Sequence, residues 1–326
     1  MSVSTRFCTA AWAVVAAVAL SGCGSSEGRV EEGRFVGERP IRIVATTGMV
    51  ADIVRVVAGE KAEVTALLGP NVDPHLHKPT RNDVLALTRT DIVFYSGLGL
   101  EGRMAELFEN VARTGTPVVA VTDGVDQDRI RNPPEFEGHP DPHVWMDVSA
   151  WSEAVGFVAE TLAEFDPPNA GYYQQNAEKY RARLQELDDY VRTVVASIPE
   201  SQRVLVTAHD AFEYFSSAYG IAVEAPQGIS TESQPGVDDI NTLVDLIVER
   251  KVPAVFIESS VSPRTIQAIQ EGAAAQGWDV AIGGQLYSDA MGPPGSYEGT
   301  YIGMMDHNAT RIARALGGEA PEDGSQ

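Results

Sequence analysis

Histidine is rare in this chain, and its placement is the first sign of metal chemistry. Only six of the 326 residues are histidine, and four of them lie in the stretches "DPHLHKPT" and "HPDPHVWMD". Both stretches contain the triplet Asp-Pro-His, at Asp73–His75 and at Asp141–His143. Proline fixes its own φ and restricts the residue before it, so such a histidine loses little entropy on binding a metal ion. One triplet would indicate a turn, whereas two in loops favour a pair of metal ligands, with each aspartate placed to orient an imidazole or the backbone.

Apolar strands that alternate with amphipathic helices predict an α/β fold. Strands that are apolar throughout, with helices between them, are typical of parallel sheets covered on both faces. Thr80 and Asp83 have the spacing of an N-terminal capping pair. The expected strands are 41–47, 64–68, 92–97, 117–122, 204–209, 221–225, 254–258 and 278–282. The expected helices are 48–58, 80–90, 101–114, 149–165, 211–219, 237–250, 263–276 and 301–316.

The alternation is interrupted once, by a long helical segment at residues 167–199. Apolar and aromatic side chains recur there in steps of three, four and seven, which defines one helical face. Its length of about 28 helical residues corresponds to about 42 Å. We therefore predict two Rossmann-like lobes with parallel sheets, joined by one long rigid helix. The domains would be an N-terminal lobe at 40–166, the linking helix at 167–199, and a C-terminal lobe with a tail at 200–326.

The candidate ligands lie in loops or where predicted strands end. His75 follows the strand that ends at residue 68, and His143 follows a proline-rich loop. His209 ends the strand "VLVTAH", and Asp289 lies in the glycine-rich loop "GGQLYSDAMGPPG". In open α/β sheets, ligands bind beyond the carboxyl ends of the strands. These four side chains are therefore candidates for one common site.

The N-terminus predicts export and lipidation. Arg6 precedes the apolar run "AAWAVVAAVAL", which is too short to cross a bilayer and is typical of a signal peptide. The run ends in "LSGC", which resembles the lipobox of bacterial lipoproteins. Residues 1–22 would then be a lipoprotein signal peptide, Cys23 the lipidated residue, and the polar residues 23–39 a flexible tether. An ordinary signal peptide with a chance cysteine is the alternative.

Charge and cysteine content exclude other classes of protein. The net charge of −22 argues against binding to nucleic acid. The two cysteines, Cys8 and Cys23, both lie near the N-terminus. The part expected to fold therefore contains neither a disulfide nor a thiolate ligand.

Five motifs, in order along the chain, resemble a known family. They are "DPHLHKPT", "DPHVWMD", "TAHDAFEYFSSAYGI", "VFIESSVSPRTI" and "LYSDAMG". The family is that of the zinc/manganese ABC transporter solute-binding lipoproteins of bacteria, the solute-binding protein 9 family (cluster A-I), and the resemblance spans about Pro40–Leu316. It implies that His75, His143, His209 and Asp289 bind Zn²⁺ or Mn²⁺ as the transported ligand in the cleft between the lobes.

The resemblance also implies partners and a location. The protein would be an extracytoplasmic monomer, lipid-anchored to the cell membrane or periplasmic. It would deliver the ion to an ABC permease driven by a cytoplasmic ATPase, and it would not be an enzyme. Zinc-specific members often carry a long histidine-rich acidic loop near "RNPPEFEGHP". That loop is missing here, so strict zinc specificity is not implied.

Three further residues are candidates for the pocket or for orienting a ligand. His77 stands where many family members have a tyrosine, and it is either a pocket neighbour or an alternative ligand. Asp210, beside His209, would orient an imidazole or lie at the start of a helix. Glu258 ends the strand "VFIE" and is within reach of the cleft.

Two other functions compete with metal transport. Three histidines with an open position would suit a metal-dependent hydrolase, but Asp289 would close the shell. The sequence also has no metalloprotease helix motif, nucleophile elbow or phosphate loop. A surface adhesin lipoprotein is the third possibility, and no residue supports it separately. For metal binding, we expect weaker affinity below about pH 6.5, because protonated imidazoles do not bind metals.

Overall fold

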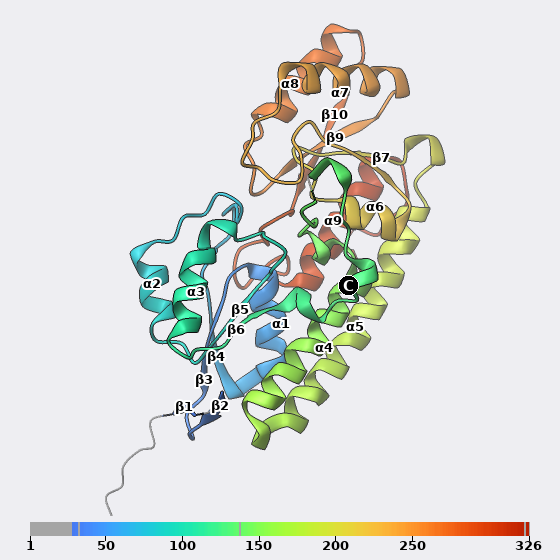
Figure 1. Cartoon of the computed structure of the whole chain (residues 1–326). Helices are drawn as coiled ribbons and strands as arrows, with labels where there is room; N and C mark the ends of the chain where they lie inside the picture. Colours follow the sequence, from blue (N-terminus) through green and yellow to red (C-terminus); the bar gives the residue numbers. More distant parts are fainter. Residues whose placement is uncertain (1–27, 32, 137, 323, 326) are drawn as a thin grey trace, which may run out of the picture.

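A computed structural model describes residues 28–325, except residues 32, 137 and 323. Two α/β lobes lie one above the other, and long helices run along one side of both (Figure 1). The expected signal peptide, residues 1–22, and Cys23 lie outside the described residues. Within the described part of the chain, no helix has the length and apolar character needed to span a membrane.

The N-terminal lobe is built on a four-stranded parallel sheet with the order β4-β3-β5-β6. The predicted parallel pairing is therefore confirmed. Thr80 and Asp83 form the predicted capping box at the start of α2. The strands are β3 (Ile41–Ala45), β4 (Ala62–Ala66), β5 (Ile92–Tyr95) and β6 (Val118–Ala120). The helices are α1 (Gly48–Ala58), α2 (Arg81–Leu87), α3 (Ala105–Arg113) and α4 (Val148–Phe165).

The C-terminal lobe contains two parallel strand pairs, β7-β8 and β9-β10. Strand β7 lies beside β9. The strands are β7 (Val204–Val206), β8 (Ala222–Glu224), β9 (Ala254–Glu258) and β10 (Ala281–Leu286). The helices are α6 (Glu213–Tyr219), α7 (Val237–Arg250), α8 (Arg264–Ala275) and α9 (Tyr301–Ala315).

The last strand differs from the expectation of 278–282. It runs through Gly283 and Gly284, and its pairing with β9 shifts register between Ile282 and Gly284. Gly284 has a φ of 127°, which only glycine adopts readily. The two glycines therefore form an irregularity within the strand rather than its end.

Helix α5 (Ala170–Ala196) is the predicted long helix, with 27 residues. At 1.5 Å per residue it is about 40 Å long. Its buried face packs against α1, α4 and α9, so it contacts elements of both lobes. The buried side chains are those of Tyr173, Ala177, Tyr180, Leu184, Leu187, Asp188, Val191, Val194 and Val195.

Part of the expected flexible tether is ordered, so that expectation is corrected. Residues 28–39 contain an antiparallel hairpin of β1 (Arg29–Glu31) and β2 (Arg34–Val36). Phe35 in this hairpin is buried, and its ring centroid lies 6.2 Å from that of Phe165. Arg39 donates hydrogen bonds of 2.7 and 2.8 Å to Asp91. An aromatic anchor and an ion pair therefore hold the segment on the N-terminal lobe.

Candidate metal site

The structure brings the four predicted ligands together. His75 lies in the loop between β4 and α2, and His143 immediately precedes the short helix η6 (Val144–Met146). His209 follows β7, and Asp289 follows β10. Their potential ligand atoms all lie within 4.8 Å of one another, and all four residues are buried. Two ligands thus come from each lobe.

The spacing of the donor atoms fits a single ion. His75 Nε2 lies 3.4 Å from His143 Nε2. The two oxygens of Asp289 lie 3.3 Å from His143 Nε2 and 3.2 Å from His209 Nε2. Four donors about 2.1 Å from one ion stand about 3.4 Å apart at the corners of a tetrahedron. The arrangement therefore has the size of a four-coordinate site.

Several of these buried atoms lack a satisfactory hydrogen bond. Among the described residues, both carboxylate oxygens of Asp289 and Nε2 of His209 are buried without one. Buried polar groups are normally paired, because leaving them unpaired costs free energy. A bound cation would satisfy these atoms at once.

Asp141 orients His143, as the Asp-Pro-His triplet led us to expect. One oxygen, Oδ1, lies 2.8 Å from the ring Nδ1 of His143 and also accepts its backbone N–H at 3.0 Å. This contact leaves Nε2 directed at the site. Burial opposes protonation of His143, but its contacts with Asp141 and Asp289 outweigh burial and raise its pKa to about 9.

Glu258 holds His209 in a similar way from the other lobe. Its Oε2 lies 2.6 Å from His209 Nδ1. Its Oε1 accepts the backbone N–H groups of Ala208 and His209 at 2.7 and 2.9 Å. Burial opposes the charge on His209, but Glu258 and Asp289 outweigh burial and raise its pKa well above the usual value. Burial likewise opposes the charge on Asp289, yet His209 and His143 hold its pKa well below the usual value.

His75 differs from the other two histidines. Asp73, the aspartate of its triplet, accepts the backbone N–H of His75 at 2.8 Å rather than contacting the ring. Burial, only partly offset by Asp289, lowers the pKa of His75 to about 3. His75 is therefore neutral at physiological pH and ready to bind a metal.

Two of the weaker candidates lie elsewhere. His77 Nε2 is 3.0 Å from Asp83 Oδ2 in the capping box of α2, so His77 is not part of the cluster. Asp210 has no side-chain hydrogen bond to an imidazole in the described part of the chain. It is not the N-cap of α6 either, since that position is Phe212. Burial, with the nearby charges of Glu213 and Asp141, raises the pKa of Asp210 to about 7.

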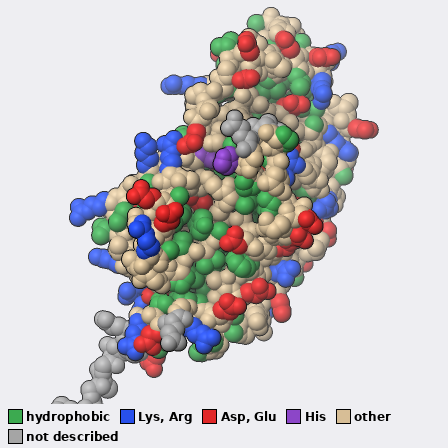
Figure 2. All heavy atoms as spheres, in the orientation of Figure 1, with side chains coloured by type: hydrophobic (Ala, Val, Ile, Leu, Met, Phe, Trp, Pro, Cys, Tyr) green, Lys and Arg blue, Asp and Glu red, His purple; other side chains and the backbone are tan. Residues whose placement is uncertain are grey.

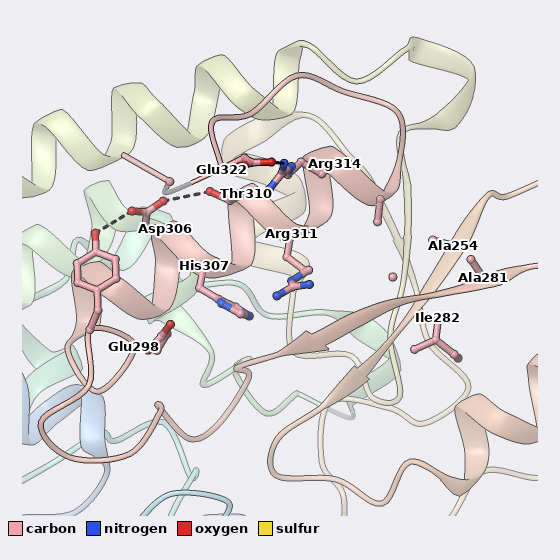
Figure 3. A pocket seen from close by; sticks show the side chains of 14 residues that line it. Ala254, Ala281, Ile282, Glu298, Asp306, His307, Thr310, Arg311, Arg314 and Glu322 are labelled. Atoms are coloured by element: carbon pink, nitrogen blue, oxygen red, sulfur yellow. Dashed lines mark hydrogen bonds and ion pairs between the residues drawn. The ribbon is translucent and has the colours of Figure 1, made fainter. Parts of the chain in front are cut away.

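A separate pocket of about 670 Å³ lies between β10 and α9. Figure 3 shows His307 and Arg311 on α9 with their side chains directed toward it. None of the four clustered residues lines this pocket. His307, which we expected to be structural or on the surface, lies with Nε2 3.0 Å from the carbonyl oxygen of Gln285.

Comparisons with known proteins agree on one family. The family described as zinc-uptake complex component A, periplasmic, matches residues 43–315. The manganese-binding lipoprotein MntA of Bacillus subtilis is 42% identical over 302 residues, which is 92% of this chain and 96% of the relative. The manganese ABC transporter substrate-binding lipoprotein PsaA of Streptococcus pneumoniae is 30% identical over 307 residues, which is 93% of this chain and 96% of the relative.

A solved structure agrees as well. The periplasmic zinc-binding protein TroA of Treponema pallidum superposes with a TM-score of 0.82 at 42% identity, covering 85% of this chain and 99% of TroA. The chain therefore belongs to the zinc-uptake component A family of ABC transporter substrate-binding proteins. The predicted family, α/β fold and substrate-binding class are confirmed, and the hydrolase and adhesin alternatives are not favoured.

Proposed function

We propose that this protein captures a divalent transition metal ion, Zn²⁺ or Mn²⁺, outside the cytoplasm and delivers it to an ABC permease. His75, His143, His209 and Asp289 would bind the ion, and the cytoplasmic ATPase of the transporter would drive uptake. The convergence of three imidazole nitrogens and a carboxylate, with unpaired buried atoms among them, supports this function. The printed names of the relatives agree with it, because MntA is called manganese-binding and TroA zinc-binding.

The proposal extends to the anchor and to the organisation of the chain. Residues 1–22 would be removed as a signal peptide and Cys23 lipidated, so that a monomer is held at the cell membrane or in the periplasm. Residues 40–166 would act as the N-terminal lobe, 167–199 as the linking helix and 200–326 as the C-terminal lobe and tail. A Cys23→Ser variant that still fractionates with membranes would contradict the anchor.

Metal content and competitive titration test the metal site. The chain without its first 23 residues, purified and stripped of metal, is titrated with Zn²⁺ and Mn²⁺ beside Asp289→Ala. We expect one ion per chain in the wild type and strongly weakened binding in the variant. Binding that is indifferent to Asp289, or no binding at all, would overturn the four-ligand assignment.

A further inference from the structure

The four clustered residues are not equally enclosed. His143 and His209 are 0% exposed and Asp289 is 2% exposed, whereas His75 is 6% exposed. Histidine atoms are visible at the surface between the two lobes in Figure 2. The His75 side is therefore the mouth of the site, where an ion enters and leaves.

The opposite side of the site is tied across the lobes by buried aromatic residues. Trp145 Nε1, in the N-terminal lobe, donates a 2.9 Å hydrogen bond to the carbonyl oxygen of Ser288, next to Asp289. Tyr301 of α9 donates its hydroxyl to the carbonyl oxygen of Trp145 at 2.7 Å. Trp145 and Tyr301 are both 0% exposed. These contacts hold the His143 and Asp289 loops together deep in the fold.

At the mouth, one hydrogen bond connects the lobes beside His75. The hydroxyl of Thr231 donates to Asp73 Oδ2 at 2.6 Å. The other oxygen of Asp73 accepts the backbone N–H groups of His75 at 2.8 Å and Leu76 at 3.4 Å. Thr231 is only 3% exposed. Asp73 therefore joins the backbone of the His75 loop to a residue of the C-terminal lobe.

The Thr231 loop is itself fixed to the strand end that carries His209. Gln227 Nε2 donates hydrogen bonds to the carbonyl oxygens of Thr231 and Ser233, at 3.0 and 2.7 Å. Gln227 forms a parallel bridge with His209, and its carbonyl oxygen accepts the N–H of Asp210 at 3.1 Å. A continuous path of contacts thus links His209 in one lobe to His75 in the other.

A second contact at the mouth is weaker. Arg103 Nε lies 2.9 Å from Glu232 Oε1, and Arg103 Nη1 lies 3.4 Å from the carbonyl oxygen of Leu76. The side chains of Arg103 and Glu232 are 32% and 54% exposed. Such exposed ion pairs contribute little because solvent and salt screen them. The buried bond between Thr231 and Asp73 is therefore the main connection here.

We propose that Thr231 is a positioning residue for His75. Its hydrogen bond to Asp73 holds the His75 loop closed over the bound ion, and breaking this bond opens the mouth for release. This inference rests on the proposed function. A hydrogen bond to a charged acceptor is among the stronger ones in proteins, so its loss should speed release of the ion by about ten-fold or more.

The test compares Thr231→Val, which keeps the shape but lacks the hydroxyl, with Thr231→Ser, which keeps the hydroxyl. Thr242→Val is the matched control, because Thr242 bonds only within α7, to the carbonyl oxygen of Asp238. Zn²⁺-loaded protein is mixed rapidly with a chelator, and the rate of zinc loss is followed. Hydrogen exchange at the amides of His75 and Leu76 is measured in the metal-free proteins.

The expected result is faster zinc loss and faster exchange at these two amides in Thr231→Val. Thr231→Ser and Thr242→Val should behave like the wild type. If the wild type holds one zinc ion and Thr231→Val releases it at the wild-type rate, the positioning role is overturned while the proposed function stands. If Thr231→Val does not fold, wild-type-like zinc release and exchange in Thr231→Ala would overturn it in the same way. If the wild type binds no zinc, both proposals are wrong.

Discussion

Glu258 contacts His209 with both of its carboxylate oxygens, one 2.6 Å from the ring Nδ1 and the other 2.9 Å from the backbone nitrogen. The ring and the main chain of His209 are therefore held by a single side chain from β9. Such a carboxylate fixes the orientation of a ligand imidazole and makes it a better donor to a metal. The side chain of Glu258 is completely buried, so solvent cannot replace the contact.

The first prediction concerns this contact. Glu258→Gln keeps the size of the side chain but removes its charge, so the affinity for Zn²⁺ should fall by about 10–100-fold. Titration calorimetry of metal-free protein measures the change. Glu271→Gln is the control, because Glu271 is exposed on α8 and has no ion pair among the described residues. Equal affinity in the two variants would contradict a positioning role for Glu258.

The second prediction concerns pH. Hydrogen bonds and charges from Asp141 and Asp289 overcome burial and raise the pKa of His143 to about 9 in the metal-free protein. Metal ions bind the neutral imidazole, so below this pKa the ion must displace a proton. Affinity for Zn²⁺ should therefore increase with pH up to about 9, well above the window set by an ordinary histidine. Calorimetry at pH 7.5 in buffers of different ionisation enthalpy should show proton release on binding.

The stability of the metal-free protein should change in the opposite direction. A raised histidine pKa adds stability that is fully present below about pH 6.5 and is lost as the pH rises through about 9. The melting temperature of metal-free protein should thus decline over this range. Asp141→Asn lowers the pKa of His143, so its decline should begin at lower pH. A decline identical to that of the wild type would show that Asp141 does not control this titration.

Much of the site could be predicted from the sequence because its residues are tied to local signals. The Asp-Pro-His triplets mark His75 and His143, and the ends of strands mark His209 and Glu258. His77 was harder, since nothing in the spacing from His77 to Asp83 distinguishes a ligand from a partner of a helix cap. The contact between Asp73 and Thr231 joins residues 158 positions apart. It depends on the closed arrangement of the lobes, which no local pattern encodes.

The fold shows the same division between local and long-range information. Apolar periodicity predicted α5 and the strands of the N-terminal lobe. The hairpin β1–β2 was missed because its composition is that of a polar linker, and the single aromatic Phe35 holds it on Phe165. The end of β10 was missed because Gly283 and Gly284 normally favour loops over strands.

The third prediction concerns the choice of metal. Three imidazoles and one carboxylate suit tetrahedral Zn²⁺, and intrinsic affinity favours zinc over manganese. The wild type should therefore bind Zn²⁺ more tightly than Mn²⁺ in a competition titration. Replacing His209 by glutamate should lower this preference, because carboxylate oxygens suit manganese better. Glu258→Gln is combined with His209→Glu to avoid two adjacent carboxylates, and Glu258→Gln alone is the control.

Two outcomes would contradict this prediction. Equal or weaker affinity for Zn²⁺ in the wild type would mean that the four residues do not act as a tetrahedral set. An unchanged zinc-to-manganese ratio in the double variant, relative to Glu258→Gln, would mean that position 209 does not contact the ion.

The last prediction concerns movement of the lobes. Leu184 and Leu187 on α5 are 0% and 3% exposed, and the helix packs on α1, α4 and α9. Bending α5 would expose such side chains, each worth about 1.5–3 kcal/mol when buried. We therefore expect a small shift of the lobes rather than a wide hinge opening, with a change of no more than about 1 Å in the radius of gyration when Zn²⁺ is added. Small-angle X-ray scattering measures this change, and Asp289→Ala should show none. A compaction of several ångströms in the wild type would show that α5 does not restrain the lobes.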